Sequence, residues 1–244
     1  MHVFADLGRW FSDPTHWSGP NGIPARVLQH LWLSFTPVGL AVLVALPAGL
    51  AIGHTRRGEF LGVSVANLGR AIPSFAILSI VYQLMLSYAP SFAFGFTPTV
   101  VALFLLAIPP ILTNTYVGVQ AVDPDTVEAA RGMGLSGRQV LARLEVPLAT
   151  PLIVTGIRTA AVQVVATATL AALIGGGGLG RFIIDGFAQG DDTMIVAGAV
   201  LVAALAILVE SAFALLERLV APRTASAGRP RRGVRWVPAI DPTR

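Results

Sequence analysis

Long apolar stretches separated by short polar segments dominate this sequence. Each stretch carries at most one charged residue and is long enough to cross a hydrocarbon core of about 30 Å. Five such stretches occur, at Leu31–Gly53, Phe60–Tyr88, Pro98–Val119, Leu148–Ile174 and Met194–Leu216. The pattern therefore predicts an all-α polytopic membrane protein with about five transmembrane helices.

Prolines fall inside two of these predicted helices. Pro73 follows Arg70 and Ile72 in the second helix, and the pair Pro109-Pro110 lies in the third. A proline within a helix removes a backbone hydrogen bond and crowds the preceding turn. We expect a kink at Pro73 and an interruption at Pro109-Pro110.

The composition excludes several kinds of chemistry. The chain contains no cysteine, so disulfides and thiol catalysis are excluded, and all 17 of its basic residues are arginine. A P-loop requires a lysine that contacts the phosphates. If ATP drives this protein, a separate chain must hold the nucleotide and its magnesium. No catalytic Ser/His/Asp set is recognisable, and the four histidines lack metal-ligand spacing.

The distribution of positive charge predicts an orientation in the membrane. Five helices place the two ends of the chain on opposite sides. Arg56 and Arg57 then lie on the same side as the arginine-rich residues 221–244. Because positive loops favour the cytoplasm, the N-terminus is expected outside the cell membrane and the C-terminus inside. We divide the chain into an extracytoplasmic segment 1–24, compatible with an interfacial helix, a transmembrane domain 25–220 and a cytoplasmic, unstructured tail 221–244.

The longest charged segment between apolar stretches, Asp123–Pro147, predicts two short helices at a right angle. Asp123 suits an N-cap and Pro124 the first helical position. Gly134 suits a left-handed C-cap, where a side chain would clash. Ser136 and Gln139 match a capping box for the second helix, which Pro147 is expected to disturb as the next span begins.

The same segment resembles a motif found in the membrane subunits of bacterial ATP-binding-cassette (ABC) importers. That motif is Glu-Ala-Ala, three residues, Gly, nine residues and then Ile-x-Leu-Pro. The matching residues here are Glu128, Ala129, Ala130, Gly134, Leu144, Val146 and Pro147. The resemblance implies that this loop is cytoplasmic and couples the permease to a separate ATPase. The alternative is a helical hairpin at the membrane surface without a partner.

Other sequence runs resemble a narrower group, the permeases that import glycine betaine, choline, carnitine and related osmoprotectants. These runs are 70–76, 114–118, 122–124, 128–134, 156–160 and 167–171. The resemblance implies half of a translocation path. The implied partners are a second permease subunit, identical or paralogous, an ATPase that binds ATP and magnesium, and an extracytoplasmic substrate-binding protein. A permease for methionine or another amino acid remains an alternative within the class.

Polar residues within the predicted spans are candidates for lining the path, because polar groups are costly in lipid and usually face a cavity or a bundle interior. The alternative is that they only tie neighbouring helices together. The candidates are Pro73, Ser74, Asn114, Tyr116, Gln163, Thr167 and Thr169. No group of aromatic residues for binding a quaternary ammonium is evident in the sequence.

Two charged residues lie at similar depth within predicted spans. Arg158 and Glu210 are each roughly 10 Å inside the boundary at about 1.5 Å per residue. We predict that they form an ion pair. The alternatives are that each side chain extends separately to the interface, or that Arg70, at a comparable depth, competes for the pair.

Two other classes of protein fit the sequence less well. A secondary transporter or channel would carry several intramembrane acids or inverted repeats, and only Glu210 is found. A scaffold or membrane enzyme would leave the polar path residues unexplained. Gly175, Gly177 and Gly180 match a dinucleotide fingerprint formally, but they follow a membrane span and are read as a turn.

Overall fold

The computed structural model describes residues 3–220 apart from positions 59, 61, 63, 65, 66, 68 and 70, and every regular element among these residues is a helix. Four helices are long and apolar enough to cross a membrane: α2 (Ile23–Thr55), α5 (Phe96–Gln120), the continuous helix Gly137–Ile174 and α10 (Asp192–Val220). A shorter apolar helix, α4 (Ser74–Tyr88), precedes α5. The protein is therefore an all-α polytopic membrane protein. Arg70 and the predicted tail 221–244 lie outside the described residues.

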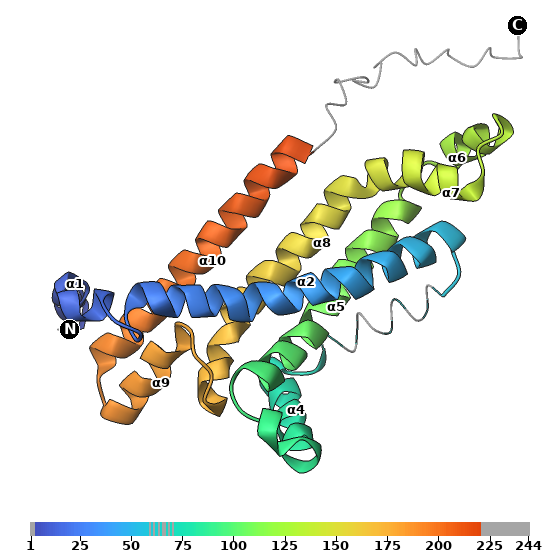
Figure 1. Cartoon of the computed structure of the whole chain (residues 1–244). Coiled ribbons are helices and arrows are strands. Elements are labelled where there is room, and N and C mark those ends of the chain that lie inside the picture. The colour runs from blue at the N-terminus through green and yellow to red at the C-terminus, as the bar shows by residue number, and fades with distance from the viewer. Residues whose placement is uncertain are drawn as a thin grey trace, which may run out of the picture.

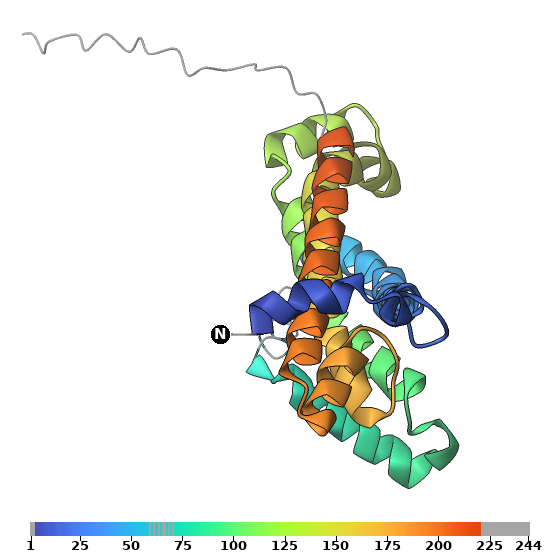
Figure 2. The ribbon, with the colours of Figure 1, turned by 90° about the vertical axis from the view of Figure 1, so that its left-hand side faces the viewer.

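The shorter helices lie at the two ends of the bundle. Helices α6 (Pro124–Gly132) and α7 (Gly137–Val140) project at one end, whereas α4 and α9 (Gly180–Gln189) lie at the other (Figures 1 and 2). Helix α5 and the long helix that contains α8 (Val146–Thr167) connect the two ends. This arrangement separates the charged loop of α6 and α7 from the glycine-rich segment 175–179, which precedes α9.

Small residues allow α2 to approach α5 closely. Ala41, Ala45, Gly49 and Gly53 recur at every fourth position of α2, and all four are buried. A Cβ at Gly49 would lie 2.7 Å from Cβ of Thr115 in α5, closer than real Cβ atoms approach. Close packing of backbones through small residues is typical of membrane helices, and it fixes α2 against the central helix α5.

The prolines affect the two predicted helices differently. The helical conformation is interrupted at Pro73, where a kink was predicted, and Pro73 is the N-cap residue of α4. The predicted interruption at Pro109-Pro110 is wrong, because α5 continues through both residues. Ala107 and Ile111 beside them are fully buried. Tight packing by neighbouring helices supports the segment despite the missing hydrogen bonds.

The fourth predicted span begins much earlier than Leu148. Helix α7, a π-turn at Leu141–Glu145, α8 and a 3₁₀ turn at Ala168–Ile174 form one continuous helix. The expected disturbance at Pro147 does not break it. The wider turn, closed by a hydrogen bond from Val146 N–H to the Leu141 carbonyl, gives the proline ring room.

The N-terminal segment does form a helix, α1 (Val3–Ser12), and it contacts the bundle. Trp10 of α1 is buried, and its ring meets Phe182 of α9 edge-on with centroids 5.6 Å apart. His16, in a 3₁₀ turn at Pro14–Trp17, stacks on the Trp10 ring with the two ring centroids 4.0 Å apart. This packing holds α1 against α9 and α10.

Candidate functional site

The loop between α5 and α8 folds through local capping interactions. The Asp123 carboxylate accepts hydrogen bonds from Asp125 N–H at 3.2 Å and the Thr126 hydroxyl at 3.0 Å, so it caps α6 as predicted. Gly134 has a φ of +88°, which confirms the left-handed C-cap. Leu135 N–H donates to the Ala130 carbonyl at 3.2 Å, and this bond completes the glycine-terminated helix end.

The start of the second helix also follows the sequence pattern. The Gln139 side-chain oxygen accepts a hydrogen bond from the Ser136 N–H at 2.8 Å. This is the return half of a capping box. The turn between the two helices is therefore fixed on both sides by the groups that the sequence indicated.

The residues of the motif differ in their exposure to solvent. Glu128, Ala129, Gly134 and Pro147 are exposed and Leu144 is half-buried. Ala130 is only 6% exposed, so its side chain is buried within this chain. The sequence analysis missed Met133, whose side chain is 77% exposed at the tip.

A histidine–carboxylate contact joins this loop to α2. Nδ1 of His54, at the end of α2, lies 2.6 Å from Oε2 of Glu145, and the Glu145 side chain is almost completely buried. A Cβ at Gly137 would lie 3.4 Å from Nε2 of His54. Sequence reasoning found no metal-ligand spacing around His54 and assigned Glu145 no role, and it could not pair them because 91 residues separate the two.

A groove of about 540 Å³ opens between the end of α2 and α6. Charged side chains of both signs line it, with His54 and Glu145 at its wall. The lining residues include Arg56, Glu128 and Arg131. The charged loop therefore presents a recessed, polar surface beside the exposed Glu128.

The structure gathers four of the seven candidate path residues into two spaces. Asn114 and Gln163 line a cavity of about 150 Å³ with Thr159 and the proline pair of α5. Thr113 also lines it, and its hydroxyl is buried without a hydrogen-bond partner among the described residues. Ser74 and Thr167 line a small crevice between α4, α5 and α8.

The remaining candidates line neither space. Tyr116 is buried beside Gly62, and Pro73 is exposed at the start of α4. Thr169 donates its hydroxyl hydrogen to the Ala166 carbonyl at 3.0 Å. Asn114 and Thr167 likewise donate to carbonyls of their own helices, so these hydrogen bonds do not tie neighbouring helices together.

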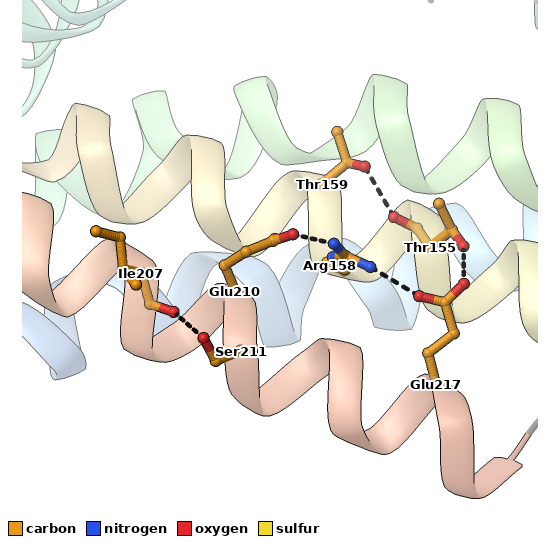
Figure 3. A network of polar contacts seen from close by, with 7 residues as sticks. All are labelled: Thr155, Arg158, Thr159, Ile207, Glu210, Ser211 and Glu217. Atoms are coloured by element: carbon orange, nitrogen blue, oxygen red, sulfur yellow. Dashed lines mark hydrogen bonds and ion pairs between the residues drawn. The ribbon is translucent and has the colours of Figure 1, made fainter.

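Arg158 of α8 lies against two acids of α10 rather than one. Its guanidinium contacts Glu210 through Nη2 and donates from Nη1 to Glu217 at 2.8 Å (Figure 3). Glu217 also accepts a hydrogen bond from the Thr155 hydroxyl at 2.9 Å. Glu217 was missed because it lies one residue beyond the predicted end of its span.

The structure is a bundle of membrane helices with polar spaces beside α5 and α8 and an exposed helical loop at one end, and this architecture fits a membrane transport protein. The sequence matches, over residues 41–225, the family described as the binding-protein-dependent transport system inner membrane component, and the chain belongs to this family of ABC importer permeases.

Two relatives illustrate the family. The glycine betaine/carnitine/choline transport system permease protein of Bacillus subtilis is 37% identical over 195 residues, which cover 80% of this chain and 87% of the relative. The carnitine transport permease protein of Listeria monocytogenes is also 37% identical, covering 82% of this chain and 89% of the relative.

The fold also matches solved structures of importers. An inward-facing structure of the MetNI methionine ABC transporter gives a TM-score of 0.72 with 23% identity and covers 85% of this chain and 98% of the solved chain. An amino acid ABC transporter gives a TM-score of 0.67 with 20% identity, over 81% and 93% of the two chains. At these identities the likeness shows the fold.

Proposed function

We propose that this chain is the permease subunit of an ATP-driven importer for osmoprotectants of the glycine betaine, carnitine and choline type. The observation that carries the substrate class is the 37% identity, over 80% of the chain, to a permease named for these three compounds. Membership of the permease family argues against the alternative classes, namely a secondary transporter, a channel or a scaffold.

The loop of α6 and α7 is the proposed contact with a separate ATPase, which would bind ATP and magnesium. Its exposed surface offers a carboxylate at Glu128, a small side chain at Ala129 and the apolar tip of Met133. Gly134 allows the sharp turn that brings these together. Leu144 and Pro147 then support the loop from its base rather than at its tip.

The proposed translocation path follows α5 and α8. Gln163 and Thr167 lie one turn apart on α8, and they line the cavity beside Asn114 and the crevice beside Ser74 respectively. Thr113 borders the same cavity as Asn114, with its hydroxyl buried and without a hydrogen-bond partner among the described residues. A second permease subunit would supply the other half of the path, and a binding protein would deliver the solute from outside.

An uptake experiment tests the substrate class. The permease, its ATPase and its binding protein would be expressed in a bacterial strain that lacks osmolyte uptake systems, and the cells given labelled glycine betaine, carnitine, choline or methionine. We expect uptake of at least one of the first three and no uptake of methionine. A matched strain whose ATPase lacks its P-loop lysine should accumulate nothing.

Methionine uptake without uptake of the quaternary ammonium compounds would contradict the proposal. It would favour the amino-acid importer instead. The likeness to the methionine transporter does not itself favour that result, because 23% identity carries only the fold.

A further inference from the structure

A second pocket, of about 560 Å³, lies at the opposite end of the bundle from the α6–α7 loop. Four parts of the chain build it: the start of α2, the start of α5, the glycine-rich segment 175–179 and the start of α9. The side chains and glycines that line it are Arg26, Gln29, Trp32, Leu33, Phe96, Gly175, Gly176, Gly177 and Arg181.

Hydrogen bonds hold the walls of this pocket in place. Gln29 accepts from Gly178 N–H at 3.1 Å, and the Nδ1 atom of buried His30 accepts from Leu179 N–H at 3.2 Å. His30 Nε2 lies 2.8 Å from the Val165 carbonyl and donates to it. Gly95 N–H donates to the Ile174 carbonyl at 2.9 Å, which joins the start of α5 to the same segment.

The pocket carries an excess of positive charge. Asp185 engages Nε and Nη2 of Arg181, at 3.2 and 2.5 Å, and leaves Nη1 for another partner. Arg26 donates to the neutral side chains of Gln29 at 2.9 Å and Asn21 at 2.7 Å. A guanidinium has five N–H donors, so Arg26 can also bind an anion. Two guanidiniums against one carboxylate suit a ligand with a carboxylate group.

Two aromatic side chains face the same pocket. Trp32 of α2 is 65% exposed and Phe96 of α5 is 50% exposed, and the fold brings them together across 64 positions of sequence. The faces of aromatic rings attract quaternary ammonium groups. Sequence reasoning found no such aromatic group because the two residues belong to different spans.

We propose that this pocket binds a zwitterion with a carboxylate at one end and a quaternary ammonium at the other, with Arg26 and Arg181 on the carboxylate and Trp32 and Phe96 on the ammonium. This proposal rests on the proposed osmoprotectant substrate. It gives the permease its own subsite for the solute, at the end of the bundle opposite the ATPase contact.

The test measures equilibrium binding of labelled glycine betaine and labelled choline to the purified permease–ATPase complex in lipid nanodiscs, without the binding protein. The wild-type complex should bind both saturably. Trp32→Ala should weaken both by about fivefold, since loss of one ammonium–aromatic contact is worth about 1 kcal/mol. Arg26→Leu should weaken glycine betaine by a similar factor but leave choline unchanged, because choline has no carboxylate.

Matched controls come from the same end of the chain. Trp17 is exposed and Arg9 lies on α1, and neither lines the pocket, so Trp17→Ala and Arg9→Leu should bind both compounds like the wild type. Arg26→Lys should recover part of the glycine betaine binding by restoring the charge. Elution of each variant complex at the wild-type volume on size exclusion would show that it is assembled.

Three results would overturn this subsite: no saturable binding by the wild-type complex, equal binding by Trp32→Ala and Trp17→Ala, or equal loss of both compounds in Arg26→Leu. If uptake of glycine betaine or choline by the complete transporter persists in any of these cases, only the subsite is wrong. If the complete transporter takes up neither compound, the proposed function itself fails.

Discussion

Gly134 has the most demanding backbone position in the charged loop. Its φ of +88° lies where a Cβ clashes with the backbone, although the space around the residue is open. The sequence was enough to predict this position, because glycine commonly ends a helix in the left-handed conformation and this preference depends only on neighbouring residues. The burial of neighbouring Ala130 depends on how the loop folds back on itself, which no local rule reports.

Gly134→Val is expected to distort the loop and uncouple the transporter. A β-branched residue in the left-handed region costs about 1–2 kcal/mol or more, which the exposed loop can relieve by changing its turn. Substrate-stimulated ATP hydrolysis and uptake should fall together in vesicles at matched permease abundance.

Two substitutions serve as controls for Gly134→Val. Gly132 is helical and a Cβ there meets nothing within 4 Å, so Gly132→Ala should behave like the wild type. Gly134→Asn should keep most activity, because asparagine tolerates this conformation. Wild-type rates in Gly134→Val would show that the turn is not required for coupling.

Helix boundaries show where sequence patterns succeed and where tertiary packing takes over. Among the described residues the pattern located all four helices that are long enough to cross a membrane, since an uncharged stretch of this length has few alternatives there. Within the predicted span Phe60–Tyr88 the structure describes a shorter helix, the 15-residue α4. It misjudged Pro109-Pro110 and Pro147, because packing around α5 and a π-turn before α8 accommodate those prolines. It also missed the contact between His54 and Glu145, which depends on how α2 lies against the helix that follows α7.

The His54–Glu145 contact is expected to link movement of the charged loop to α2. His54→Ala leaves a buried carboxylate without its partner, which should cost about 1.5–3 kcal/mol. We expect a lower midpoint of thermal unfolding of the purified complex and less substrate transported per ATP. Glu145→Ala should have similar effects, and the double variant should lose less than the sum of the two single losses.

Neighbouring Thr55 provides the comparison for this pair. Its hydroxyl donates to the Ala51 carbonyl of its own helix at 2.7 Å and accepts only a long hydrogen bond from Arg57 N–H at 3.4 Å, so Thr55→Ala should change neither measurement. His54→Gln retains a side-chain N–H donor and should recover part of the coupling. If the losses of His54→Ala and Glu145→Ala simply add, the two residues act independently and the link between α2 and the loop is not made by this contact.

Across the whole molecule, polar features separate to the two ends. The charged loop of α6 and α7 lies at one end of the bundle, and α9 and the start of α5 lie at the other (Figure 1). His54 and Glu145 line the groove beside the loop. Trp32 and Phe96 line the pocket between α2, α5 and α9. The small cavities beside α5 and α8 lie along the helices that connect these ends. A solute site at one end and a contact with an ATPase at the other require the two ends to face opposite sides of the membrane.

Cysteine labelling tests this orientation directly, because the chain contains no cysteine and each single-cysteine variant needs no other change. Ser91, Gln189 and Met133 are exposed, and Met133 is separated from the other two by α5 and by the continuous helix Gly137–Ile174. Arg56 and Arg57 follow α2 on the side of Met133, which favours the cytoplasm for that side.

An impermeant maleimide should therefore label Ser91→Cys and Gln189→Cys in intact cells. Met133→Cys should react only after the cells are permeabilised, with a cytoplasmic cysteine protein as the marker of integrity. Labelling of Met133→Cys alone in intact cells would reverse the orientation, and equal labelling of all three would contradict the arrangement of the spans.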